Sequence, residues 1–138
     1  MSAEQLIIAR ASAELGEKYR VEIRTGDHQL TADEPVRMGG AGSGPAPYEL
    51  LLSSLAACTM ITLRMYAERK GMALEGVSID LKFLRDRENK DQTRIDRTIT
   101  VKGALSEAER ARLADIAERT PVTLTLKSGV SIRTELRS

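Results

Sequence analysis

The sequence has few of the side chains on which many binding sites depend. It has no tryptophan, and aromatic residues make up only 3% of the chain: Tyr19, Tyr48, Tyr66 and Phe83. Stacking platforms for nucleic-acid bases and aromatic cages for cations need several such rings close together. So few rings argue strongly against both kinds of site.

Cysteine and histidine each occur once, as Cys58 and His28. A single cysteine has no partner within the chain, which excludes an intrachain disulfide framework. A zinc site built from cysteine and histidine needs about four ligands, and two are too few. We therefore expect no metal site and no bound cofactor.

Neither sign of charge is in excess. The chain has 21 Lys and Arg against 20 Asp and Glu, which leaves a net charge of +1. Nucleic-acid binders usually carry a basic stripe, and peripheral membrane proteins often carry a polybasic anchor, so both classes are disfavoured. The first ten residues, MSAEQLIIAR, lack the basic region and long apolar core of a signal peptide. We expect a soluble, cytoplasmic protein.

The 138 residues predict one domain over residues 1–138. A capping box at Ser106 and Glu109 opens a helix that ends near Arg119. Residues 122–127 either begin another helical turn or run extended. Residues 8–13, which mix apolar and small side chains, are expected to be a strand, and residues 28–32 to be the second arm of a hairpin with residues 19–25. Apolar and polar residues alternate as in strands over residues 19–25, 77–83, 95–101 and 130–136. This order predicts an α+β fold with mainly antiparallel sheets.

The most unusual segment is a predicted helix over residues 48–70. A glycine- and proline-rich loop, residues 39–47, precedes it, and Gly71 follows it. Residues 50–63 are apolar or small on every side, which is typical of a helix that is buried all round. One sheet of a small domain covers one side of such a helix. We therefore expect a homodimer with this helix near its interface.

Elimination leaves Cys58 as the candidate reactive residue. The glycine loop lacks the Lys-Ser/Thr of a P-loop, and no G-x-S-x-G elbow is present, so His28 is expected to be a hairpin residue. A lone cysteine on an apolar helix is often an inert packing residue. A reactive one needs a nearby cation or helix N-terminus, and Arg20, Arg24 and Arg37 are the cations that the sequence suggests.

Residues 45–59, PAPYELLLSSLAACT, resemble the signature of the OsmC/Ohr family (osmotically inducible protein C and organic hydroperoxide resistance). The resemblance implies an intertwined homodimer in which two long central helices are flanked by sheets from both chains. It continues in the family's order through residues 62–67, 69–71, 95–99, 103–105, 113–118 and 121–122.

The resemblance also implies peroxidase chemistry. In the best-known branches the cysteine that matches Cys58 attacks an organic hydroperoxide and becomes a sulfenic acid. A second cysteine, in a Cys-Pro-Val-His-type motif, then forms a disulfide with it. In this chain the motif reads Thr120-Pro-Val-Thr123, so the second cysteine is a threonine. A sulfenate at Cys58 would therefore need an external thiol.

The family also places an arginine and a glutamate beside the cysteine. Where the glutamate is expected this chain has Tyr48, and Glu49 follows one residue later. On a regular helix Glu49 and Cys58 lie on opposite faces, roughly 13 Å apart. The alternative role of Glu49 is to complement the helix dipole from the first helical turn. Arg20 is the candidate partner of the thiolate, and its alternative role is that of a solvated residue on a strand.

Two functions stay open. The first is a one-cysteine thiol peroxidase that reduces organic hydroperoxides with an external thiol, using Cys58, Arg20 and Glu49. The second is a dimer of the same fold that binds a small apolar or electrophilic ligand in its interface pocket without peroxide turnover. We expect the substrate pocket to be lined by Tyr48, Leu51, Leu55, Met60 and Thr120.

Overall fold

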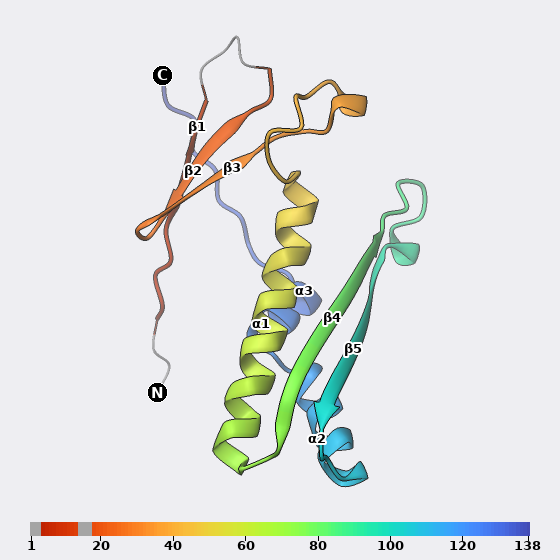
Figure 1. Ribbon diagram of the computed structural model, residues 1–138. Coiled ribbons are helices and arrows are strands. Elements are labelled where there is room, and N and C mark those ends of the chain that lie inside the picture. Colours follow the sequence, from red (N-terminus) through yellow and green to blue (C-terminus); the bar gives the residue numbers. More distant parts are fainter. Residues whose placement is uncertain (1–3, 14–17) are drawn as a thin grey trace. The chain divides into compact units, whose positions relative to one another are not determined.

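The computed structural model describes residues 4–13 and 18–138. The chain forms two compact units, residues 1–51 and 52–138 (Figure 1). Each unit contains an antiparallel sheet, and a long helix follows the first sheet, so the predicted α+β class is confirmed. The expectation of one domain over residues 1–138 stays a prediction.

The first unit contains a three-stranded antiparallel sheet in the order β1-β2-β3. Its strands are β1 (Ala9–Ser12), β2 (Val21–Thr25) and β3 (His28–Ala32). Gly26, with a φ of 57°, begins the tight turn between β2 and β3, and His28 pairs with Thr25 across it. The expectation that His28 is a hairpin residue is therefore confirmed.

The glycine loop of the first unit is built around the carboxylate of Asp33, which is 2% exposed. It accepts hydrogen bonds from the backbone N–H groups of Glu34 at 2.7 Å, Ala41 at 3.3 Å and Ser43 at 3.1 Å. The Ser43 hydroxyl donates a fourth at 2.6 Å. These bonds, that of the hydroxyl above all, lower the pKa of Asp33. The carboxylate thereby satisfies backbone donors of the segment that follows β3.

Two glycines of this loop are required by close backbone contacts. A Cβ added at Gly40 would lie 2.0 Å from the carbonyl oxygen of Glu34, and one at Gly44 would lie 2.2 Å from that of Thr31. Both neighbours are backbone atoms, which cannot rotate away as a side chain can. The loop therefore excludes every side chain at these two positions.

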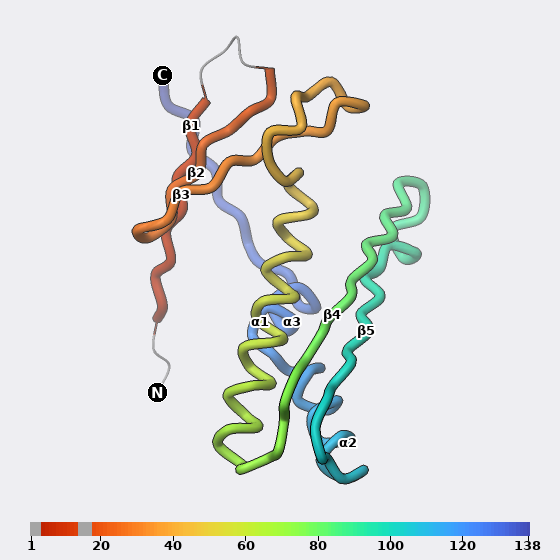
Figure 2. The backbone as a smooth tube through the Cα atoms, viewed as in Figure 1, coloured from red at the N-terminus to blue at the C-terminus, as the bar shows by residue number. Residues whose placement is uncertain are grey.

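The second unit combines helices with a two-stranded antiparallel sheet. Helix α1 (Pro47–Lys70) begins in the first unit and continues through the second, close to the prediction of 48–70. The tube in Figure 2 shows β4 and β5 running side by side as an antiparallel pair, with a turn that joins them. The other elements are β4 (Leu74–Leu84), β5 (Arg94–Gly103), α2 (Glu107–Ala117) and α3 (Pro121–Ser128), with short 3-10 helices at Val36–Met38 and Lys90–Gln92.

The core of the second unit lies between α1, α2 and the sheet. Its buried centre consists of Leu63 and Tyr66 from α1 and Leu113 and Ala117 from α2. The Tyr66 hydroxyl accepts a hydrogen bond from Arg112 Nε at 2.8 Å. Partly buried apolar side chains pack against this centre: Met72, Leu74, Val77, Ile99, Val101, Leu105 and Ile116.

Helix α1 is less covered within one chain than its composition predicts. It is long and apolar enough to span a membrane, as core helices of soluble proteins also can be, yet only 28% of its most apolar 18-residue stretch is buried. Ile61 is 57% exposed and Met65 is 63% exposed. Together with Ala57, which is also exposed, they form a row at intervals of four residues along one side of α1.

The prediction of a last strand over residues 130–136 is wrong for the single chain. Residues 129–138 run without regular structure after α3. Val130 is 68% exposed, Ile132 82% and Leu136 97%. An alternating segment becomes a strand only when a neighbouring strand accepts its backbone hydrogen bonds, and no such pairing is formed by these described residues. For residues 122–127, by contrast, the helical alternative is correct.

Candidate functional site

Cys58 lies on α1 and is half-buried. Its sulfur accepts a hydrogen bond from the backbone N–H of Val122 at a distance of 3.5 Å. The next residue, Thr59, is fully buried, and its hydroxyl donates to the carbonyl oxygen of Leu55 at 2.7 Å. Segments 64 residues apart in the sequence thus meet at the thiol.

The Val122 N–H is available because of where α3 begins. Thr120 is the N-cap of α3 and Pro121 is its first residue, so Val122 lies in the first turn. N–H groups in the first turn have no acceptor inside the helix, and they carry the positive end of the helix dipole. At this helix end, one such donor is directed at the Cys58 sulfur.

The guanidinium of Arg97, on β5, lies at the centre of a group of polar contacts that includes Thr59, the residue after Cys58. The Arg97 side chain is 11% exposed. Its Nη1 donates to the hydroxyls of Thr59 and Thr123, each at 2.9 Å. Its Nη2 donates to the carbonyl oxygen of Ala117 at 2.8 Å and to the carboxylate of Glu118 at 3.1 Å. One side chain thus joins β5, α1, the end of α2 and α3.

Three threonines complete this group, which we call the Arg97 cluster: Arg97, Thr59, Thr120 and Thr123. Thr59 and Thr120 are fully buried and Thr123 is 5% exposed. The hydroxyls of Thr120 and Thr123 lie 2.6 Å apart and share a hydrogen bond. Among the described residues, no buried side-chain nitrogen or oxygen lacks a hydrogen-bond partner. The cluster is therefore a satisfied polar network.

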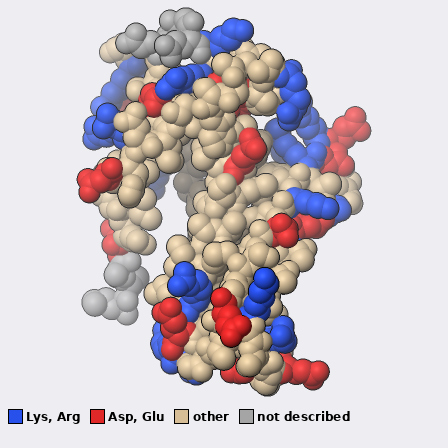
Figure 3. All heavy atoms as spheres, in the orientation of Figure 1, with Lys and Arg blue, Asp and Glu red and all other residues tan. Residues whose placement is uncertain are grey.

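Glu118 connects the cluster to solvent. Its carboxylate is 62% exposed and pairs with Lys127 at 3.2 Å as well as with Arg97. The hydrogen bond from Lys127 is the largest cause that lowers the pKa of Glu118, followed by the charge of Lys127, with smaller contributions from Arg97. On the face of the molecule shown in Figure 3, basic and acidic side chains are interspersed.

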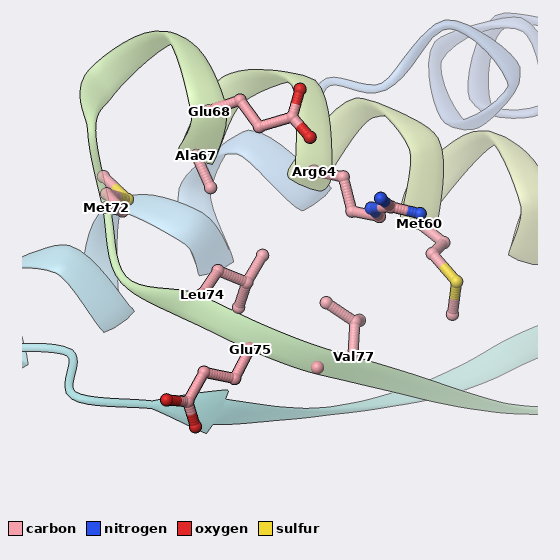
Figure 4. A pocket seen from close by; sticks show the side chains of 9 residues that line it. Met60, Arg64, Ala67, Glu68, Met72, Leu74, Glu75 and Val77 are labelled. Carbon is pink, nitrogen blue, oxygen red and sulfur yellow. The ribbon is translucent and has the colours of Figure 1, made fainter.

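The structure brings together only some of the predicted site residues. Cys58 and Thr120 lie in the same part of the second unit, at the start of α3. Leu55 is buried on α1, one turn before Thr59. Met60 instead lines a groove of about 400 Å³ between α1 and β4. In Figure 4 Leu74 and Val77 project from β4 towards α1 in this groove.

The remaining predicted site residues belong to the first unit. Arg20 forms an ion pair with Glu22 at 2.7 Å. The Glu49 carboxylate accepts a hydrogen bond from the Ala46 N–H at 2.9 Å, which is the contact expected of an acidic residue in the first turn of a helix. Tyr48 is 47% exposed and Leu51 is half-buried. Their roles in catalysis or binding stay predictions.

Sequence reasoning missed Arg97 and Glu118. A signal for Arg97 was present, because β5 alternates and Arg97 falls in the same row as Ile95, Ile99 and Val101. A charged residue in the inward row of a strand needs buried partners. No comparable pattern marked Glu118. Among the described residues, no group of three or more His, Cys, Asp or Glu side chains could hold a metal ion.

Comparison with known proteins finds one matching family and many solved structures with a similar fold. The family described as OsmC-like protein matches residues 40–135. No curated protein matches the chain. An OsmC-like protein from Mycoplasma pneumoniae superposes with a TM-score of 0.76 at 22% identity, covering 91% of this chain and 89% of that one.

Two further solved structures show the same fold. A putative osmotic stress induced and detoxification response protein from Psychrobacter arcticus has a TM-score of 0.72 at 18% identity, with 91% of each chain covered. An organic hydroperoxide resistance protein OsmC from Legionella pneumophila has a TM-score of 0.67 at 23% identity, with 91% of this chain and 92% of that one covered. At these identities the similarity establishes the fold.

Proposed function

Because the chain belongs to the OsmC family, we propose that it is a thiol peroxidase that reduces organic hydroperoxides through its one cysteine, Cys58. The similar Legionella protein is named for resistance to organic hydroperoxides, and this supports the same substrate class. The match to the family includes both Cys58 and the start of α3.

The contact between the Val122 N–H and the Cys58 sulfur carries the proposal. The nucleophilic form of cysteine is the thiolate, and helix N-termini and nearby cations favour that form. An N–H group at the start of α3 reaches the sulfur, and the cationic Arg97 binds the hydroxyl of the next residue along α1. An inert packing cysteine needs neither feature.

The reaction takes two stages. The Cys58 thiolate attacks the terminal oxygen of the hydroperoxide, an S–O bond forms, the O–O bond breaks, and the alcohol leaves after taking up a proton. The cysteine is oxidised to sulfenic acid. A low-molecular-weight or protein thiol then attacks this sulfur and releases water, and a second thiol reduces the mixed disulfide. The reductant is external because Thr120 occupies the place of a second cysteine.

The functional form is a cytoplasmic homodimer in this proposal. The exposed row of Ala57, Ile61 and Met65 on α1 gives a second copy an apolar surface to cover. The exposed apolar residues after α3 offer a second such surface. Arg20 and Glu49 are then candidates to act beside the thiol of either copy, and Tyr48, Leu51, Leu55 and Met60 to contact the apolar part of the peroxide.

The decisive experiment is intact-mass analysis after addition of one equivalent of an organic hydroperoxide in the presence of a sulfenic-acid trap. Rapid, stoichiometric trapping in the wild type and none in Cys58→Ser is the expected result. A wild-type thiol that stays unmodified over minutes would contradict peroxidase activity. The alternative function, binding of an apolar or electrophilic ligand at the dimer interface, would then be the one to test.

The dimer has its own test. Light scattering during gel filtration should give twice the chain mass of 15.1 kDa for the wild type. Met65→Glu places a charge in the exposed row of α1 and should shift the protein towards the monomer, whereas Glu68→Gln on the same helix should not. A wild type that is monomeric at all concentrations would contradict the homodimer.

A further inference from the structure

The start of α3 is held in place by a side chain from another element. Thr120 and Thr123 flank Pro121 and Val122, the first two residues of the helix. The Thr120 hydroxyl makes no capping bond to the backbone, and it pairs with Thr123 instead. Thr123 in turn accepts a hydrogen bond from Arg97. The first turn of α3 is thus tied to β5 by side chains on both sides of Val122.

The same guanidinium also holds the segment that carries Cys58. One nitrogen, Nη1, donates to both Thr59 and Thr123 at 2.9 Å. Thr59 adjoins Cys58 and Thr123 adjoins Val122 in the sequence. Nη1 of Arg97 therefore binds the neighbour of each residue in the N–H to sulfur contact: Thr59 next to Cys58, and Thr123 next to Val122. Because the guanidinium is planar and presents its donors in a rigid fork, it sets both neighbours in one geometry.

We propose that Arg97 is a positioning residue for Cys58: it aligns the start of α3 with the thiol so that the Val122 N–H meets the sulfur. This inference rests on the proposed function, since it assigns the means by which Cys58 becomes reactive. Arg97 acts through Thr59 and Thr123 and is not itself a catalytic residue.

The charge of Arg97 adds to this effect. Three of its four acceptors, the hydroxyls of Thr59 and Thr123 and the Ala117 carbonyl, are neutral. The fourth, Glu118, is mostly exposed and shared with Lys127. The buried part of the cluster therefore retains positive charge beside the helix segment that carries the thiol. Positive charge favours an anion such as a thiolate.

The test measures the rate at which Cys58 is alkylated by iodoacetamide, as a function of pH, in the full-length protein. Arg97→Met removes the fork while keeping much of the side-chain volume. We expect its alkylation rate at pH 7 to fall about tenfold, and its rate profile to move to higher pH. Arg97→Lys restores the charge and a donor, so it should recover part of the rate.

Two further variants keep the test decisive. Arg94→Met removes an exposed arginine of the same strand, paired with Asp96, and should leave the rate unchanged. Thr123→Val removes one acceptor of Nη1 with little change in volume, and should slow alkylation about threefold even if Arg97→Met does not fold. Circular dichroism establishes which variants are folded. Folded Arg97→Met or Thr123→Val protein with wild-type rates and pH profile would overturn the inference.

Failure of this inference and failure of the proposed function give different results, because alkylation requires no peroxide. If wild-type Cys58 is alkylated rapidly, Arg97→Met slowly, and neither reacts with hydroperoxide, the peroxidase is excluded and the positioning role stands. If the wild type reduces hydroperoxide and the variants are alkylated equally fast, the positioning role is excluded and the peroxidase stands.

Discussion

Among the described residues, a polar network forms around a charged side chain in each unit: around buried Asp33 in the first and around Arg97, whose side chain is 11% exposed, in the second. In the first unit Asp33 accepts four hydrogen bonds from Glu34, Ala41 and Ser43. In the second unit Arg97 donates four, to Thr59, Thr123, Ala117 and Glu118. In both cases most partners are neutral, so it is hydrogen bonds that compensate much of the lost hydration of the charge.

The two networks differ in the sequence distance that they span. The partners of Asp33 lie between one and ten residues away along the chain. Those of Arg97 lie between 20 and 38 residues away, on three different helices or helix ends. The Asp33 network shapes one loop, whereas the Arg97 cluster joins elements that only the folded unit brings together. The loss of Arg97 should therefore disturb much more of the structure.

The largest effect is expected for Arg97→Met. It leaves the hydroxyls of Thr59 and Thr123 and the Ala117 carbonyl without their buried donor, and bonds from charged donors contribute about 1.5–3 kcal/mol each. We expect the free energy of unfolding to fall by about 2–4 kcal/mol in urea titrations. Arg94→Met, which breaks only an exposed ion pair, should change it by less than about 0.5 kcal/mol.

The next largest effect tests the loop of the first unit. Gly44→Ala forces a Cβ to within 2.2 Å of the Thr31 carbonyl oxygen, so the backbone must move. A loss of about 2 kcal/mol in the free energy of unfolding is expected, as for other overpacked sites. Gly76→Ala is the control, because its Cβ would meet Lys102 at an ordinary 3.8 Å. Equal stability of the two variants would contradict the close contact.

A smaller effect is expected from Thr120→Val. This change keeps the side-chain volume of a fully buried residue and removes only its hydrogen bond to Thr123. The remaining contacts of Arg97 stay intact, so the loss should be about 1 kcal/mol. Thr98→Val, on the exposed row of β5, should have almost no effect. Loss of several kcal/mol in Thr120→Val would indicate that the cluster cannot tolerate partial removal.

The smallest effect concerns the exposed end of the cluster and depends on pH. The folded-state pKa of Glu118 lies below its ordinary value of 4.5, chiefly through Lys127. Glu118 therefore contributes stability above pH 4.5 and loses it as the pH falls through the lower, folded-state pKa. Because the carboxylate is mostly exposed, Glu118→Gln should cost less than about 0.5 kcal/mol at pH 7.

The acid limb of the same titration supplies the control. The difference between Glu118→Gln and the wild type should vanish at acid pH, where the wild-type carboxyl group is itself neutral. If the difference in free energy of unfolding between Glu118→Gln and the wild type stays constant with pH, the contribution of Glu118 to stability comes from the packing of its side chain and not from its charge. The deficit of Arg97→Met should persist over this range, because arginine keeps its charge.

The sequence was informative wherever neighbouring residues determine the structure. Helix α1 begins within one residue of its predicted start and ends at its predicted end. Residues 48–70 contain no glycine or proline, and the proline-rich loop before them and Gly71 after them mark the two ends of the helix. The turn at Gly26 also follows from local chemistry. The strand predicted over residues 130–136 does not form, because no strand of the described residues pairs with that segment.

For the candidate site, the sequence identified the thiol but not its surroundings. Cys58 stood out as the only cysteine, and the family resemblance pointed to Thr120 as the residue in place of a second one. The arginines suggested for it all lie in the first 40 residues, whereas Arg97 is the one whose contacts reach Thr59 and Thr123. Its inward position on β5 could be inferred from alternation, but its partners could not.

The sequence by itself determined the family, the single thiol, the absence of a second cysteine and the limits of the long apolar helix. Composition and short-range order decide these properties, and folding does not change them. Only the tertiary structure decided that the start of α3 meets Cys58 and that Arg97 joins the two. Those contacts connect residues 26 to 64 positions apart, and they exist only where packing of α1, α2 and the sheet has brought the segments together.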